Sequence, residues 1–137
     1  MKTNLVVYIS AAMVLAALTI PRAALGQPPR INRTELQRQN ISVSGRQAIQ
    51  VRIDFAPGAK FAKHKHPGEE VIYVLEGLFE YEVEGKPPVT LKAGDVLFIP
   101  AGTIHSARNV GTTNASELAT YIVEKKKPLV VMVGEHK

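Results

Sequence analysis

Short alternating segments, each ended by a turn, are the feature that most constrains the fold of this 137-residue chain. Ile49, Val51 and Ile53 alternate with polar residues, which is the period of a strand with one buried face. Similar short strands are expected at residues 71–75, 78–83, 89–91, 96–99, 104–108, 118–123 and 129–133. Only residues 34–37 suggest a helical turn. The regular spacing predicts roughly eight to ten strands in one all-β sandwich or barrel domain.

The first 26 residues differ from the rest in composition. Lys2 precedes a 16-residue apolar run at residues 5–20, and small residues then lead to Gly26. This pattern predicts a signal peptide at residues 1–26, and hence an exported protein, periplasmic or extracellular, with no stable membrane anchor after cleavage. A retained anchor is the alternative, although the run is shorter than the ~20 residues that span a bilayer. Residues 27–46 are expected to form a leader and first strand, and residues 47–137 the barrel.

Charge and cysteine content exclude several kinds of function. Loss of residues 1–26 removes two basic side chains and no acidic one, so the net charge falls from +5 to +3. The basic run at residues 125–127 has no nucleic-acid-binding motif beside it, so we expect a solvated turn and no nucleic-acid partner. The chain has no cysteine, which excludes disulfides and thiolate metal sites.

Two of the four histidines, His64 and His66, lie one residue apart. On a strand they project from the same face, and Glu70 shares their parity, which favours it over Glu69. Pro67 and Gly68 interrupt the strand in the manner of a bulge. A polar loop leading into a strand is the simple alternative, but two imidazoles and a carboxylate can also meet one cation.

His105 is the candidate for a fourth ligand. It follows the apolar segment 96–99, which Pro100 ends and Gly102 turns. The two regions thus share a layout: a turn containing glycine, and then a histidine near the beginning of a strand.

With these residues the chain resembles the cupin superfamily. The first cupin motif is matched by Gly58-x5-His64-x-His66-x3-Glu70-x6-Gly77, and the second by Gly94-x5-Pro100-x-Gly102-x2-His105-x3-Asn109. The resemblance covers about residues 49–123 and is to small single-domain, quercetin-dioxygenase-like cupins. It implies a jelly-roll β-barrel in which His64, His66, Glu70 and His105 converge on one divalent transition metal. It also implies that the motif glycines occupy turns at torsions costly for other residues.

The implied ligand set leaves the metal open among iron, manganese, nickel, copper, cobalt and zinc. A cupin that kept its fold without metal is the alternative, but its buried carboxylate would then be costly. The resemblance implies an enzyme acting on a small oxygen-rich substrate, by dioxygenase-type chemistry or as a Lewis-acid isomerase or decarboxylase. A non-catalytic exported module that binds a small ligand through its metal is the second hypothesis. No separate general base stands out, since Tyr73, Tyr81 and Tyr121 are interpreted as packing residues.

Two further expectations concern the surface. Residues 71–75 are apolar at every position, and small cupins commonly pair through a sheet face, so the resemblance implies a homodimer. The basic residues near the motifs are interpreted as ordinary surface charge. Among them, Arg52 has the parity opposite to Val51 and Ile53 and is expected to point outward.

Overall fold

All regular structure in the described part of the protein is β-strand. The computed structural model describes residues 30–134, so the predicted signal peptide lies outside the described residues. Within this range no helix has the length and apolar character needed to cross a membrane. The all-β class predicted from the alternating segments is confirmed.

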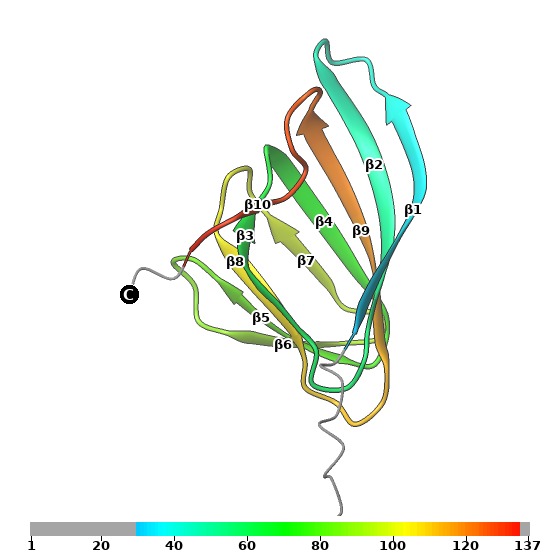
Figure 1. Ribbon diagram of the computed structural model, residues 1–137, viewed down its shortest axis with the longest axis vertical. Coiled ribbons are helices and arrows are strands. Elements are labelled where there is room, and N and C mark those ends of the chain that lie inside the picture. Colours follow the sequence, from blue (N-terminus) through cyan, green and yellow to red (C-terminus); the bar gives the residue numbers. More distant parts are fainter. Residues whose placement is uncertain (1–29, 135–137) are drawn as a thin grey trace, which may run out of the picture.

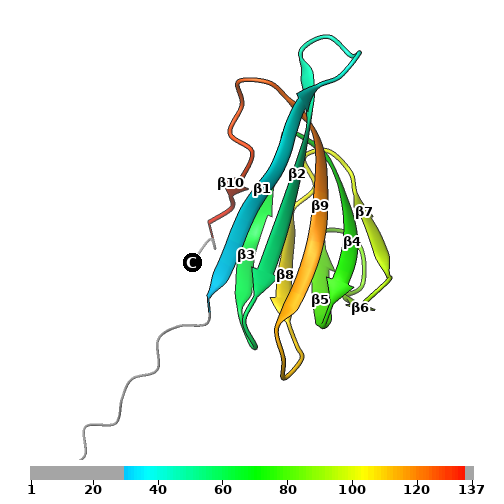
Figure 2. The same ribbon diagram turned by 90° about the vertical axis from the view of Figure 1, so that its right-hand side faces the viewer.

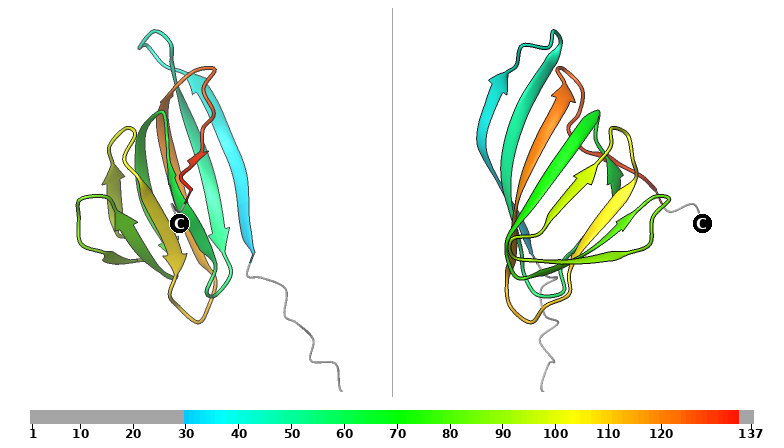
Figure 3. Two further views of the ribbon diagram at one scale, coloured as in Figure 1. Left: turned by 60° about the vertical axis from the view of Figure 1, so that its left-hand side comes forward. Right: turned by 180° about the vertical axis from the view of Figure 1, so that it is seen from behind.

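Ten strands form two antiparallel sheets that face each other (Figure 1). The strands are β1 (Ile31–Asn40), β2 (Arg46–Phe55), β3 (Lys60–Lys65), β4 (Gly68–Glu76), β5 (Leu78–Val83), β6 (Val89–Lys92), β7 (Val96–Ile99), β8 (His105–Asn109), β9 (Ala115–Glu124) and β10 (Val131–Met132). One sheet has the order β1-β2-β9-β4-β7 and the other β10-β3-β8-β5-β6. Figure 2 views the molecule from the side of the first sheet, with β3, β8 and β5 behind it. The sheets approach each other at one end and diverge at the other (Figure 3), and the two facing antiparallel sheets confirm the jelly-roll barrel that was expected.

The alternation of side chains decides which residues enter the space between the sheets. On β2, Ile49, Phe55 and the apolar residues between them are at most 4% exposed. Phe55 meets Phe79 of the facing sheet edge to face, with ring centroids 5.1 Å apart. Arg52 points outward, as predicted, and pairs with Asp54 at 2.9 Å. The apolar core is therefore the layer between the two sheets.

The helical turn expected at residues 34–37 is wrong, because this segment belongs to β1. β1 pairs with β2 along its length, with a register shift between Glu35 and Gln37. Leu36 lies at this bulge and is 54% exposed. Pairing with β2 satisfies the backbone donors and acceptors that an isolated helical turn would leave to solvent.

The glycines of the two motifs occupy the left-handed torsions that were expected. Gly58, Gly77, Gly94 and Gly102 have φ values of 74°, 78°, 91° and 71°. Residues with a Cβ rarely adopt this region, so these positions favour glycine. At the end of the second motif, the side-chain amide nitrogen of Asn109 donates hydrogen bonds to the carbonyl oxygens of Phe55 and Thr113, at 3.0 and 2.8 Å.

The outer face of β4 and β7 carries apolar side chains that no residue in the described range 30–134 covers. Val71 lies opposite Phe98, and Tyr73 lies opposite Val96. These four side chains are 43–66% exposed. On β4, only the inner face of the apolar segment is therefore buried within the chain.

Candidate metal centre

A corner of the chain, where it passes from one sheet to the other, positions three of the four predicted ligands. His64 lies near the end of β3, His66 follows that strand, and Glu70 lies on β4 in the facing sheet. The expectation that all three project from one strand is therefore wrong. At the corner, Gly68 packs so closely on β9 that a Cβ there would lie 2.0 Å from the carbonyl oxygen of Ile122.

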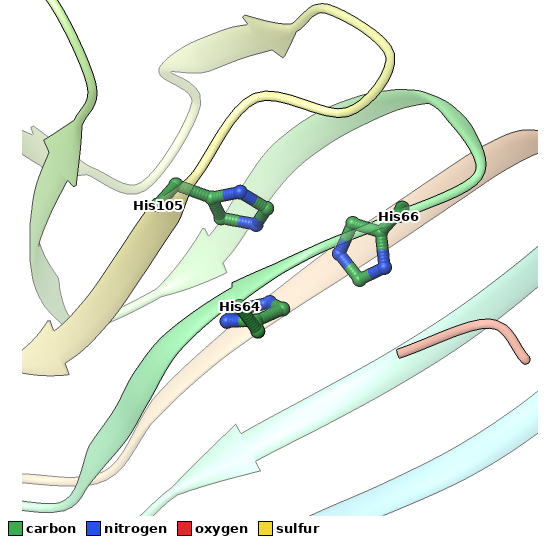
Figure 4. Close-up of side chains that lie close together, drawn as sticks. All are labelled: His64, His66 and His105. Atoms are coloured by element: carbon green, nitrogen blue, oxygen red, sulfur yellow. The ribbon is translucent and has the colours of Figure 1, made fainter. Parts of the chain in front are cut away.

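The four predicted side chains meet inside the barrel. His105, the first residue of β8, lies opposite His64 across the β3–β8 pair. Figure 4 shows His64, His66 and His105 converging, and one ring nitrogen of each lies within 4.8 Å of the others. Oε2 of Glu70 is 3.0 Å from Nε2 of His105 and 3.3 Å from Nε2 of His66. All four residues are at most 4% exposed, whereas the rival Glu69 pairs with Arg46 outside at 3.3 Å.

Backbone carbonyls orient all three imidazoles. Nδ1 of His64, His66 and His105 lies 2.8, 2.6 and 3.0 Å from the carbonyl oxygens of Ala62, Leu129 and Thr103. Because a carbonyl only accepts, each Nδ1 must donate a proton, and in the neutral ring Nε2 keeps its lone pair. A ring fixed in this way by its second nitrogen is typical of metal-binding histidines.

The protonation states also suit a cation. Burial, followed by the charge of His105, lowers the pKa of His64 to about 4, so this ring is neutral at pH 7. Burial alone would raise the pKa of Glu70, but His105 and His66, when they present a proton and positive charge to it, outweigh burial and bring that pKa to about 2; with neutral rings a cation would take the place of that proton. Neutral imidazoles with a carboxylate are the forms that bind a divalent metal.

Two polar atoms at the centre lack a hydrogen-bond partner. Among the described residues, Nε2 of His66 and Oε2 of Glu70 are the buried side-chain atoms in this condition. Neither their 3.3 Å contact nor the 3.0 Å contact between Oε2 and Nε2 of His105 qualifies as a hydrogen bond. A cation bound by both atoms would remove the cost of burying them unpaired. The residues present therefore fit a divalent metal.

A small cavity of about 10 Å³ adjoins the centre, with room for about one water molecule or ion. It is lined by Arg33, Ile53, Phe55, Phe61, His64, Glu70, Tyr81, His105, Ala107, Glu117 and Tyr121. A larger cavity of about 730 Å³ shares only His105 with the four predicted ligands. The small cavity is therefore the one that belongs to the candidate metal centre.

Two residues that the sequence pattern did not single out, Arg33 and Glu117, also line the small cavity. The hydroxyl of Tyr81 donates to Glu117, and the guanidinium of Arg33 donates to the hydroxyl of Tyr121 at 3.2 Å. Tyr81 and Tyr121 thus pack in the core, as interpreted, but they also hold polar partners. The sequence does contain a signal for Glu117. It lies an even number of residues from Tyr121 on β9, so both side chains point to the same, inner face of the sheet.

Burial makes Glu117 a pH-dependent source of instability. It raises the pKa of Glu117 to about 8 against the opposing hydrogen bond from Tyr81. The folded state therefore retains a proton that the unfolded state loses near pH 4.5, and stability falls as the pH rises from there to about 8. We expect Glu117→Gln to remove this dependence of stability on pH. At pH 8 its free energy of unfolding should be roughly 2–4 kcal/mol higher than that of wild type.

Urea unfolding from pH 4 to pH 9 in a chelator measures this difference. Glu124→Gln, on the same strand but paired with Lys127 at the surface, should leave the slope above about pH 5 unchanged, because the pKa of Glu124 is lowered by that pair. Equal slopes in Glu117→Gln and wild type would contradict the expectation.

The sequence pattern of the Cupin domain family matches residues 51–121. The oxalate-binding protein of Thermotoga maritima is 41% identical over 73 residues, which are 53% of this chain and 60% of that protein. The dimethylsulfoniopropionate lyase DddQ of Ruegeria pomeroyi is 41% identical over 51 residues, covering 37% of this chain and 25% of the lyase.

Solved structures extend the likeness to the fold. The DddQ crystal structure superposes with a TM-score of 0.59 at 27% identity, over 64% of this chain and 45% of that one. An oxalate oxidase in complex with the substrate analogue glycolate gives a TM-score of 0.57 at 29% identity, over 63% of this chain and 46% of that one. The chain thus matches less than two thirds of the length of each of these proteins.

Proposed function

Because this chain belongs to the cupin family, we propose that it binds one divalent metal ion through His64, His66, Glu70 and His105. The observation that supports the proposal is the buried meeting of three oriented imidazoles with a carboxylate oxygen that has no hydrogen-bond partner. When bound, such an ion supplies Lewis acidity and, if it is iron, manganese, nickel, copper or cobalt, redox chemistry; zinc supplies Lewis acidity alone.

The protein's own residues prepare this centre. The carbonyls of Ala62, Leu129 and Thr103 hold the rings so that the lone pairs point inward. The surrounding core excludes water, which strengthens electrostatic interactions at the centre. The carboxyl group of Glu117 holds a proton at neutral pH beside the same small cavity.

For the function, we favour an enzyme that acts on a small oxygen-rich substrate. The similar structures include an oxidase bound to glycolate and a lyase, both named for reactions of small organic molecules. The oxalate-binding relative favours a second candidate, a module that holds a small ligand at its metal without turnover. Incubation of metal-loaded protein with oxalate, glycolate, diols, flavonols and uronates, followed by oxygen uptake and product analysis, separates the two. Binding without any turnover would favour the module.

Metal binding itself is tested by elemental analysis of purified protein. We expect about one transition-metal ion per chain in wild type and none above background in the double variant His64→Ala, His105→Ala, because two of four ligands are lost. Circular dichroism of the double variant checks that the β-structure is retained. A wild type that holds no metal and takes up none on titration would exclude this function.

We also propose that the apolar outer face of β4 and β7 pairs with a second copy of the chain. Val71, Tyr73, Val96 and Phe98 expose a contiguous apolar surface, which monomers rarely leave uncovered. Light scattering at micromolar concentration is expected to give a dimer for wild type and a monomer for Phe98→Glu. A monomeric wild type would contradict the pairing.

Export through cleavage after Gly26 remains a prediction from the sequence. The intact mass of protein purified from its native compartment tests it. A mass that includes residues 1–26 would exclude cleavage.

A further inference from the structure

The small cavity at the candidate metal centre has two lining residues that reach solvent. Of its lining residues, Arg33 and Phe61 are half-buried and every other one is buried. The guanidinium of Arg33 lies 5.5 Å from the ring centre of Phe61 and 6.0 Å from that of Tyr121. Arg33 and Phe61 are therefore the lining residues beside which the cavity can reach solvent, and the guanidinium lies at that point.

The charge of Arg33 has no carboxylate partner. Among the described residues no carboxylate oxygen lies within 4.0 Å of it, and its hydrogen bond goes to the hydroxyl of Tyr121. In contrast, four arginines on the surface pair with carboxylates at 2.7–3.4 Å, namely Arg38, Arg46, Arg52 and Arg108. A guanidinium has five N–H donors in a planar fork that matches a carboxylate, so residues 30–134 leave most of this capacity unused.

The charges around the cavity favour an anion. The negative charge of Glu70 balances only one of the two charges of a divalent metal, and Arg33 adds a further positive charge. Glu117 brings no compensating charge at neutral pH, because its carboxyl group keeps its proton. With neutral imidazoles the loaded site carries about two positive charges in a water-poor environment, where charge interactions are strong.

We propose that Arg33 is a specificity-determining residue that selects small carboxylate anions by pairing with the carboxylate beside the small cavity. This inference rests on the proposed metal site. The cavity holds about one water molecule, so only the end of a ligand that meets the metal would enter it, and the carboxylate of a short acid would lie outside it, toward Arg33 and Phe61.

Calorimetric titration with glycolate and its neutral isostere glycolamide tests the proposal on the manganese-loaded protein. We expect wild type to bind glycolate at least about 10-fold more tightly than glycolamide. Arg33→Gln should weaken glycolate binding by about 10- to 100-fold and abolish the preference, because a charge-assisted pair is lost. Arg33→Lys should keep part of the preference, since it retains charge without the planar fork. Arg38→Gln, on the same strand, should behave as wild type.

Metal content, measured on each sample, separates this inference from the proposed function. If Arg33→Gln keeps one metal per chain and an undiminished preference for glycolate, the role of Arg33 is overturned while metal binding stands. If wild type takes up no metal, the proposed function is overturned and this inference with it. Should Arg33→Gln unfold, Arg33→Met and Arg33→Lys provide the same comparison.

Discussion

Replacing Glu70 by glutamine is expected to lower the affinity for a divalent metal roughly 100-fold or more, whereas Glu69→Gln should leave it unchanged. The two residues are adjacent, but Glu70 is 3% exposed inside the barrel and Glu69 pairs with Arg46 on the outside. Glutamine keeps the shape of the side chain and removes the charge, so the variant isolates the electrostatic contribution of the carboxylate. Loss of that charge leaves a cation with three neutral ligands in a buried site.

Competition of each purified variant against a chromophoric chelator measures the two affinities. Thermal unfolding in excess chelator checks that Glu70→Gln remains folded without metal. Equal affinities for Glu70→Gln and Glu69→Gln would show that the buried carboxylate is not a ligand.

Replacing Gly77 by alanine is expected to lower the free energy of unfolding by roughly 2–5 kcal/mol, against about 1–2 kcal/mol for Gly85→Ala. Both glycines have nearly the same φ, 78° and 77°, so they share the cost of a Cβ in this conformation. They differ in their surroundings. A Cβ on Gly77 would lie 2.5 Å from Cα of Ala115 and 2.7 Å from the carbonyl oxygen of Asn114, whereas a Cβ on Gly85 meets nothing within 4 Å.

Urea denaturation of wild type and the two variants gives the comparison, since equal m-values make the midpoints directly comparable. The additional loss in Gly77→Ala reports the close packing of the β4–β5 turn on β9. If the two variants lost the same stability, torsion alone would explain both glycines and the close approach would have no energetic weight.

Local patterns explain how much of this fold could be predicted. Alternation along residues 49–55 placed β2 and its inward face correctly, because successive side chains of a strand point to opposite sides. The same rule selected Glu70 over Glu69. It failed at residues 34–37, where the sequence suggested a helical turn and pairing with β2 forms a strand. A first strand was expected within residues 27–46, but without its bounds or register, so the inward position of Arg33 could not be predicted.

The sequence alone determined the all-β class, the glycine turns and which side chains could serve as ligands, since residue spacing and backbone torsion are local properties. The tertiary structure decided that Glu70 approaches from the facing sheet, that the carbonyl of Leu129 orients His66, and that Arg33 lines the small cavity beside the centre. Such contacts join residues far apart in the chain, as in the hydrogen bond from Arg33 to Tyr121, 88 positions away. They depend on how two sheets fold over each other, and no spacing along the chain encodes that.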